Sequence, residues 1–504
     1  MYQNLQALAW VIWDGKKGDF VSFLKRIFIV IGLFLSAAIA VSAEQSKLAS
    51  HPDVASNIAL LEAWLEARMA YDGQPGVSVA IVYDQELVYA KGFGYADIAA
   101  KKPMEPGTIF RIASHSKLFT SIALMRLQEA GKLDLDDPIV KHLPWFDIGD
   151  DHPGDRPITI RHLITHTSGL PREIGSAYWQ DFNFPTIDEV KKRVPDLETT
   201  FPTENRWKYS NFALTLAGEI VATVSEQPFA DYVQENIIDV LGMDQTSVVF
   251  PSGHGAALAT GYGRRMPDGT REVMPFIDAQ GMAAATGVSS SVTDMAKFIS
   301  WQFRLRAGIE TEILNANTLR EMQRVQWVLP DWNGGWGLGF GINRYNGRDL
   351  IGHGGGYPGY ITNTTIDAKS KVGVVVFTNA LGGPAYTVRA RAYDWIAPAI
   401  AKAVKGEEGM EGDPAWRKYE GTYRAQWGDS HVMTLEGKLV LIDPTAANPK
   451  EGLLTLRPAS DGTFILTGKN GGRAVGEGVS FEMGADGRAQ RIRVGVNWSE
   501  RVEY

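Results

Sequence analysis

The chain has 504 residues, of which 44% are hydrophobic and 21% are charged, which suits a globular protein of at most roughly three domains. Its net charge of −8, without any basic stripe, argues against nucleic acid as a partner. The absence of cysteine excludes disulfides, thiolate metal sites, cysteine catalysis and a lipid-modified cysteine after a leader.

The first segment shows the order of features that is typical of a secretory signal peptide. Lys25-Arg26 precedes an apolar run over 27–41, and small residues at 41–43 offer a cleavage site. The run of about 15 residues is short for a bilayer span of roughly 20. We therefore predict a signal peptide over 1–43, membrane contact only during export, and a periplasmic or secreted protein. A protein anchored in the membrane by residues 27–41 is the alternative.

Helix and strand patterns after the leader predict an α+β domain over residues 44–405. The expected helices cover 53–70, 114–130 and 384–404, and the expected strands cover 77–83, 87–93, 339–342, 350–353, 360–367 and 372–377. A loop-rich, mostly helical insertion runs from the second helix to about residue 280. The strands would form one antiparallel sheet flanked by helices, with the insertion as a helical subdomain and the active site at the junction.

A charged, glycine-rich linker is expected over 406–413, and the sequence changes in character after it. Residues 414–504 contain seven short strand candidates separated by turn signals, at 419–423, 431–435, 439–442, 453–456, 463–466, 479–483 and 491–496. This spacing predicts a small antiparallel β barrel or sandwich without an evident catalytic set.

The most informative motif is Ser114-His115-Ser116-Lys117, where the helix expected over 114–130 begins. A serine and a lysine three residues apart share one helix face, and the amine can make the hydroxyl nucleophilic near neutral pH. If Ser114 caps the helix, the positive end of the helix dipole also favours its alkoxide. His115 points away from this face and is expected to pack. By itself this spacing is a weak signal in a chain of this length.

Two further motifs follow in chain order. Tyr209-Ser210-Asn211 offers a tyrosine that, beside a buried lysine, can lose its proton more easily than usual and act as a base. Asn211 can hold the lysine and a substrate carbonyl. His353 opens a run of three glycines, which allows close backbone approach and leaves N–H groups free for an oxyanion hole. The ordered set of three motifs is more informative than any one member.

The motifs resemble those of the serine β-lactamase and penicillin-binding-protein superfamily, on its class C-like branch. That branch includes class C β-lactamases, D-stereospecific peptidases, D-aminopeptidases and esterases. Further similar segments are 76–82, 166–170 and 288–296, and the resemblance covers roughly residues 50–400. It implies a β-lactamase/transpeptidase-like fold, and neither a cofactor nor a metal is expected.

The resemblance also implies a role for each motif. Ser114 would be the acylated nucleophile, with Lys117 and Tyr209 as the proton-transfer pair. Asn211 would orient the substrate. The backbone N–H groups of Ser114 and Gly356 would form the oxyanion hole.

Gly355, beside Gly356, belongs to the same substrate-binding stretch. His353 stands where class C β-lactamases carry the lysine of a K-T-G triplet. A neutral imidazole gives a weaker and pH-dependent positive field than an ammonium group, which disfavours binding of a β-lactam carboxylate. Histidine here is similar to the peptidase and aminopeptidase members.

Two other patterns are interpreted as structural. His162 and His166 lie four apart, as in zinc-binding helices, but the glutamate of such motifs and a third ligand are missing. Residues 76–80 are similar to a nucleophile elbow but continue into a strand, which argues against an α/β-hydrolase.

We therefore expect a serine hydrolase that forms a covalent acyl-enzyme on amide or ester bonds. The expected substrates are D-amino-acid-containing peptides, including peptidoglycan-derived ones, or small esters. Hydrolysis of β-lactams, and a non-catalytic sensor that binds penicillin or peptidoglycan, are the alternatives. The substrate pocket is expected to involve residues 176–184 and 326–336.

Overall fold

The computed structural model describes residues 46–149, 152, 154, 156–250, 255, 257–309, 311–468 and 474–503. The chain divides into two units, Met1–Lys47 and Leu48–Tyr504, and every element below belongs to the second. The predicted signal peptide lies outside the described residues. Among the helices in these ranges, none combines the length and the apolar character that a bilayer span requires.

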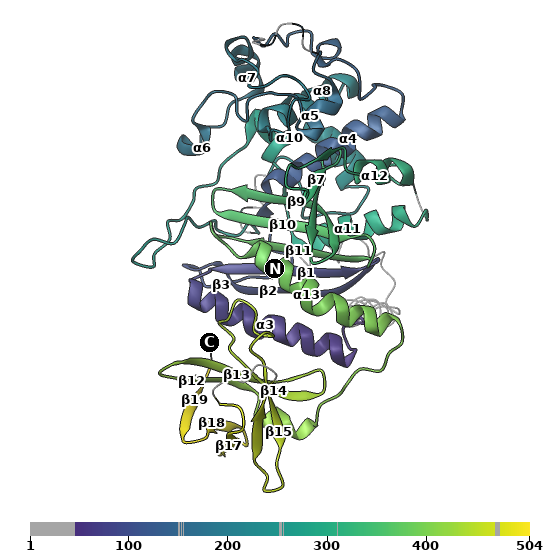
Figure 1. The fold of residues 1–504 in the computed structure, drawn as a ribbon. Helices are drawn as coiled ribbons and strands as arrows, with labels where there is room; N and C mark the ends of the chain where they lie inside the picture. Colours follow the sequence, from purple (N-terminus) through teal and green to yellow (C-terminus); the bar gives the residue numbers. More distant parts are fainter. Residues whose placement is uncertain are drawn as a thin grey trace, which may run out of the picture. The chain divides into compact units, whose positions relative to one another are not determined.

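A nine-stranded antiparallel sheet is the main element of the described residues that precede the C-terminal strands (Figure 1). Its strand order is β3-β2-β1-β11-β10-β9-β8-β7-β6. The strands are β1 (Gly76–Tyr83), β2 (Glu86–Asp97), β3 (Lys102–Pro103), β6 (Trp327–Val328), β7 (Gly334–Trp336), β8 (Gly341–Tyr345), β9 (Arg348–Tyr357), β10 (Tyr360–Asp367) and β11 (Val372–Thr378). Because β1 pairs with β11, with Val77 opposite Thr378, the sheet joins the two ends of this region.

Helices cover both faces of the sheet. On one face, α3 (Pro52–Asp72) and α13 (Ala385–Val404) pack on the side chains of β1 and β11 that include Val79 and Val374. On the other face lies α11 (Val292–Arg306), which packs against the same two strands. Burial on both faces explains why β1 is apolar along most of its length. The predicted α+β architecture is confirmed.

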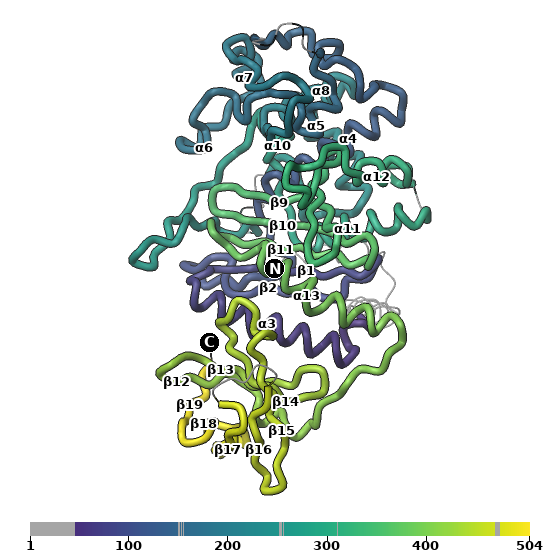
Figure 2. Tube along the Cα trace, viewed as in Figure 1, coloured from purple at the N-terminus to yellow at the C-terminus, as the bar shows by residue number. Residues whose placement is uncertain are grey.

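The predicted helical subdomain is built mainly around α4 (Ser116–Glu129), α8 (Asn211–Ser225) and α10 (Ala283–Thr286), which contact one another. The tube in Figure 2 shows these helices grouped beyond the sheet. The other short helices of this part of the chain are α5 (Ile160–Thr165), α6 (Tyr178–Asp181), α7 (Ile187–Arg193), α9 (Phe229–Val233) and α12 (Ala316–Met322). Two short strands, β4 (Phe110–Arg111) and β5 (Ser289–Ser290), pair beside α4.

The C-terminal region forms a closed eight-stranded antiparallel barrel, which confirms the expected small β fold. Its strands are β12 (Gly421–Ala425), β13 (Gly428–Leu435), β14 (Lys438–Ile442), β15 (Leu454–Pro458), β16 (Phe464–Thr467), β17 (Gly478–Met483), β18 (Ala489–Val494) and β19 (Asn497–Val502). The single strand predicted over 491–496 is wrong, because a hairpin turns at Gly495. A glycine with φ +60° in the first turn position is typical of such a two-residue turn.

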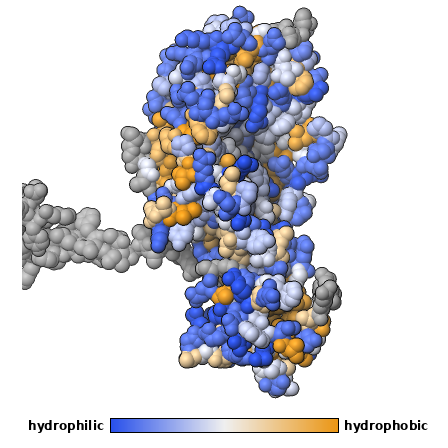
Figure 3. Space-filling view, turned by 90° about the vertical axis from the view of Figure 1, so that its left-hand side faces the viewer, coloured by the Kyte–Doolittle hydropathy of each residue, from blue (hydrophilic) through white to orange (hydrophobic). Residues whose placement is uncertain are grey.

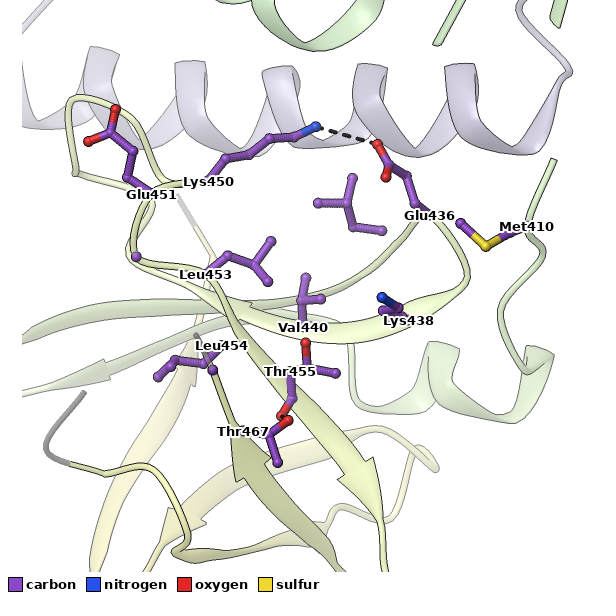
Figure 4. A pocket seen from close by; sticks show the side chains of 13 residues that line it. Met410, Glu436, Lys438, Val440, Lys450, Glu451, Leu453, Leu454, Thr455 and Thr467 are labelled. Atoms are coloured by element: carbon purple, nitrogen blue, oxygen red, sulfur yellow. Dashed lines mark hydrogen bonds and ion pairs between the residues drawn. The ribbon is translucent and has the colours of Figure 1, made fainter. Parts of the chain in front are cut away.

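The barrel rests on α3. Trp64 of α3 donates its indole N–H to the carbonyl of Ala446 at 2.9 Å, and Lys450 donates to Oδ1 of Asn57 at 2.6 Å. A cavity of about 970 Å³ lies at this junction, where Lys450 also reaches Glu436 at 3.5 Å (Figure 4). The residues that line the cavity come from the barrel and the segment before it, so this cavity is separate from the catalytic candidates. The domain boundaries at 405 and 414 stay a prediction.

Strand β9 carries the glycine run and is longer than the predicted strand over 350–353. Pairing with β8 ends at Gly352, so the rest of β9 pairs only with β10. A Cβ added at Gly355 would lie 2.3 Å from the carbonyl oxygen of Ile112 and 2.3 Å from Oγ1 of Thr362. Glycine is therefore required at this position for β9 to lie against the turn that carries Ser114.

We predict that Gly355→Ala lowers the free energy of unfolding by about 1–3 kcal/mol, because a methyl group would be forced into backbone that cannot move aside. Gly356→Ala is the matched control, since its added Cβ would meet only Ile361 at 3.8 Å. Urea denaturation of both variants and the parent measures the difference. Equal stability of the two variants would contradict the close approach of β9.

Candidate active site

Ser114 lies in a one-turn 3₁₀ helix, Ala113–His115, directly before α4. The expectation that Ser114 caps the long helix is wrong: the residue at the N-cap of α4 is His115, and it makes no side-chain capping bond. The preceding residue, Ala113, has φ +52°, a left-handed conformation that costs a residue with a side chain free energy. The tight turn places Ser114 ahead of the helix, partly exposed to solvent.

Short hydrogen bonds hold this turn in place. Ser116 Oγ donates to the carbonyl of Ala113 at 2.7 Å and accepts from the backbone N–H of Val288 at 2.9 Å. His115 is fully buried, and its Nδ1 lies 2.8 Å from the carbonyl oxygen of Ile112. His115 therefore packs behind the nucleophile turn, as expected from its position in the motif.

Lys117 has no exposed surface, and its Nζ makes three contacts. Nζ lies 3.1 Å from Oγ of Ser114, 2.8 Å from Oδ1 of Asn211 and 2.8 Å from the carbonyl oxygen of Ala285. Burial lowers the pKa of Lys117 well below its ordinary value, and the nearby Glu173 carboxylate offsets this only in part. The amine is therefore biased toward its neutral form, which has a lone pair for the proton of Ser114.

Tyr209 and Asn211 arrive at the same point from the start of α8. Ser210 caps this helix by accepting from the N–H of Ala213 at 2.9 Å, which fixes both of its neighbours. The Tyr209 hydroxyl is hydrogen-bonded to Ser114, and its ring centroid lies 4.8 Å from Nζ of Lys117.

The idea that Tyr209 ionises easily is wrong. Burial raises the pKa of Tyr209 above its ordinary value of 10, although the bond to Ser114 and the guanidinium of Arg172 act in the opposite direction. A neutral Lys117 gives little stabilisation to a phenolate. Burial therefore favours the neutral hydroxyl of Tyr209, and the lowered pKa of Lys117 favours its neutral amine.

His353 lies on β9 among aromatic rings. Its ring centroid is 6.3 Å from Tyr209, 5.4 Å from Trp336 and 6.1 Å from His115. Burial, helped by the nearby Lys117, lowers the pKa of His353 to about 3. The imidazole is thus uncharged at neutral pH, and its Nε2 has no hydrogen-bond partner among the described residues.

A second set of residues, outside the three motifs, supports the motif residues. Glu173 accepts from Nδ2 of Asn211 at 2.8 Å and is paired with the neighbouring Arg172 at 3.1 Å. The ring of His166 stacks 4.4 Å from that of Tyr209, and its Nδ1 accepts from the N–H of Ser210 at 3.2 Å. The segment similar to the family at 166–170 was the one available signal for this support.

The open edge of β9 runs from this cluster toward a group of aromatic rings. Gly356 is exposed, and its neighbour Tyr357 lies within 6 Å of the rings of Trp179 and Phe184. Trp179 and Trp336 belong to the two segments expected to shape the pocket, 176–184 and 326–336. Both segments therefore reach the site.

The two histidines four residues apart have other partners. His162 Nδ1 accepts from the N–H of Thr159 at 3.1 Å, and its Nε2 lies 3.3 Å from Glu204. His166 supports Tyr209 as described. In the part of the chain that the structure describes, no group of three histidine or acidic side chains is arranged to hold a metal ion.

The chain is similar in sequence to one curated protein and in fold to two solved structures. Penicillin-binding protein 4* of Bacillus subtilis (strain 168) is 26% identical over 441 residues, which cover 80% of this chain and 88% of that protein. The octameric penicillin-binding protein homologue from Pyrococcus abyssi matches 88% of this chain and 99% of its own, with 25% identity and a TM-score of 0.59. The D-amino acid amidase from Ochrobactrum anthropi SV3, complexed with D-phenylalanine, matches 69% of this chain and 99% of its own, with 26% identity and a TM-score of 0.57.

The sequence model of the family described as Beta-lactamase matches residues 61–398, which is more than half of the chain. This range contains all of the motif residues and the whole nine-stranded sheet. The chain therefore belongs to the Beta-lactamase family.

Proposed function

We propose that this protein is a serine hydrolase that cleaves amide or ester bonds through a covalent ester on Ser114. The observation that carries the proposal is the environment of Lys117. A neutral amine has two N–H donors and one lone pair. In the neutral form that its lowered pKa favours, Lys117 donates to the two acceptors at 2.8 Å, Asn211 and the Ala285 carbonyl, and the lone pair faces the Ser114 hydroxyl at 3.1 Å.

The proposed reaction follows from this geometry. Lys117 takes the proton of Ser114 as Oγ attacks the substrate carbonyl carbon, and the carbonyl oxygen becomes an oxyanion. The N–H groups of Ser114 and Gly356 stabilise that oxyanion. The Tyr209 hydroxyl, bonded to Ser114, relays the proton to the leaving nitrogen or oxygen as its bond to carbon breaks. A water molecule then repeats the sequence on the ester and restores Ser114.

For the substrate, we propose D-amino-acid-containing peptides or amides, or small esters. The neutral His353 supplies no fixed positive charge for the carboxylate of a β-lactam. The aromatic rings beyond Gly356 suit an apolar side chain on the substrate. Similarity to a D-amino acid amidase supports the same class.

A second candidate is a protein that is acylated by penicillin or peptidoglycan fragments without turnover. Similarity to two penicillin-binding proteins favours it. β-Lactam hydrolysis is the third candidate function. The rate at which Ser114 is acylated and the rate at which the acyl group is released distinguish the three candidates.

We predict that Ser114→Ala, Lys117→Ala and Tyr209→Phe each lower kcat/KM for a nitrophenyl ester by on the order of 10³-fold or more. Labelling by a fluorophosphonate probe should disappear in Ser114→Ala. Lys132→Ala and Tyr71→Phe are matched controls, because both side chains are exposed. Near-parental turnover in any of the three site variants would remove the role assigned to that residue.

We predict that the stability of the parent rises with pH relative to Lys117→Met. The folded pKa of Lys117 lies below the unfolded value of 10.5, so the unfolded chain binds more protons between these two pKa values. The penalty of burying the cation is complete below the folded pKa and vanishes as pH rises toward 10.5.

Urea denaturation from pH 6 to 9.5 measures the difference, whose slope is at most about 1.4 kcal/mol per pH unit. Lys132→Met serves as the control for an exposed lysine. Parallel stability curves for the parent and Lys117→Met would show that Lys117 is charged and cannot be the base.

We predict that the protein hydrolyses short nitrophenyl esters, releasing nitrophenol, or D-amino acid amides, releasing ammonia. For these substrates kcat/KM should be at least tenfold above that for a chromogenic cephalosporin. The reason is that His353, next to the open edge of β9, is uncharged and gives no positive charge to bind the carboxylate of the cephalosporin. A panel of these substrates, with L-amino acid amides as the stereochemical control, measures the order. Fastest turnover of the cephalosporin would favour the β-lactam hydrolase.

A further inference from the structure

Two tryptophans are exposed at one end of the C-terminal barrel. Trp427, in the turn between β12 and β13, is 94% exposed, and Trp498, at the start of β19, is 48% exposed. Strands β12 and β19 are paired, with Arg424 opposite Glu500. Continuing this antiparallel register by two residues places position 426 opposite Trp498. The two indole side chains therefore lie at the same end of neighbouring strands.

A row of charged side chains crosses the outer face of the barrel next to these rings. The row runs through cross-strand neighbours on five strands: Asp429, Arg424, Glu500, Arg491 and Glu482. Negative and positive groups alternate along it. Figure 1 shows β12, β18 and β19 together at this corner of the barrel.

The same charged groups lie beside the tryptophans, and one of them contacts Trp498. Arg424 makes two hydrogen bonds to Asp429, at 2.8 and 2.7 Å, across the hairpin that carries Trp427. The guanidinium of Arg491 lies 4.2 Å over the ring of Trp498 and also bonds Glu500 at 3.0 Å. Rigid presentation of an exposed ring reduces the entropy lost when it binds a ligand.

The chemistry of this surface fits one kind of ligand. Sugar rings present a flat face of C–H groups that stacks on indole, and an edge of hydroxyls that bonds carboxylate and guanidinium groups. The charged row has three carboxylates and two guanidinium groups, so it lacks the positive excess that attracts anionic membranes.

A protein interface of stable size is also a poor fit. A stable protein–protein interface buries about 1,200 Å² or more around an apolar core. Two indoles and the exposed Val496 are too few to form such a core. On the face seen in Figure 3, the barrel at the lower end is mostly hydrophilic, with only separate hydrophobic patches.

We propose that this end of the barrel binds a polysaccharide, with Trp427 and Trp498 stacking on successive sugar rings. The platform is defined by these two residues and the charged row beside them. It is separate from the Ser114 site, so it would hold the enzyme on a polymer and leave hydrolysis of a small soluble substrate unchanged.

The experiment is co-sedimentation of the full chain with three insoluble polymers: purified peptidoglycan sacculi, chitin and cellulose. We expect retention by at least one of them, and a drop in affinity on the order of tenfold for Trp427→Ala or Trp498→Ala. Tyr71→Ala is the matched control, since Tyr71 is an aromatic side chain that is 67% exposed but lies on α3, outside the active site and the barrel. Nitrophenyl ester hydrolysis, measured on each variant, reports folding and keeps this test independent of the proposed function.

Several outcomes would overturn the proposal. These are no retention of the parent by any of the polymers, equal retention of the Trp427→Ala/Trp498→Ala double variant, or an equal loss in Tyr71→Ala. Sedimentation of the protein with anionic lipid vesicles would assign the surface to a membrane. A changed oligomeric state of the double variant by light scattering, without a loss of polymer binding, would assign it to self-association.

Discussion

The site depends on one buried amine. Lys117 has no contact with solvent, and its nitrogen meets three oxygen atoms: a hydroxyl, a side-chain amide and a backbone carbonyl. A charged ammonium would be costly there, because the Glu173 carboxylate reaches it only through Asn211. The neutral form satisfies two acceptors and leaves a lone pair, so burial favours the form of Lys117 that the proposed mechanism uses as a base.

The rest of the fold brings the partners of this amine together. The capped start of α8 places Tyr209 and Asn211 on either side of Ser210, and the ring of His166 supports Tyr209 from behind. Strand β9 approaches from the sheet, and Gly355 allows its backbone to touch the turn before Ser114. The left-handed Ala113 within that turn is a local cost that the bonds of Ser116 and the packing of His115 offset.

Two neutral groups beside the amine then shape the chemistry. Burial keeps Tyr209 protonated and His353 uncharged, so the groups next to Ser114 are hydroxyls, an amine and an imidazole, and the nearby charges of Arg172 and Glu173 pair with each other. For this reason we propose a neutral amide or ester as the substrate, and not an anionic ring-fused lactam. The barrel adds a separate polar surface, whose paired charges and exposed indoles have no evident link to the catalytic residues.

The sequence by itself determined the local parts of this protein. Periodicity and turn signals located most helices and strands, since those depend on neighbouring residues, and Ser114, Lys117, Tyr209, Asn211 and His353 were recognisable from short motifs. The structure confirms the family and the α+β fold with its barrel, and it brings the motif residues into one cluster.

Only the tertiary structure decided the ionisation of these residues and their support. The sequence suggested a readily ionised Tyr209, but the pKa of a phenol depends on burial and on charges that arrive from distant segments. It gave no sign of Glu173 behind Asn211, because that contact joins a loop to a helix 38 residues later. Ser114 is not the N-cap of α4 for a related reason. The start of α4 depends on the packing of Gly355 and Val288 against the turn before it, and not on the helix pattern alone.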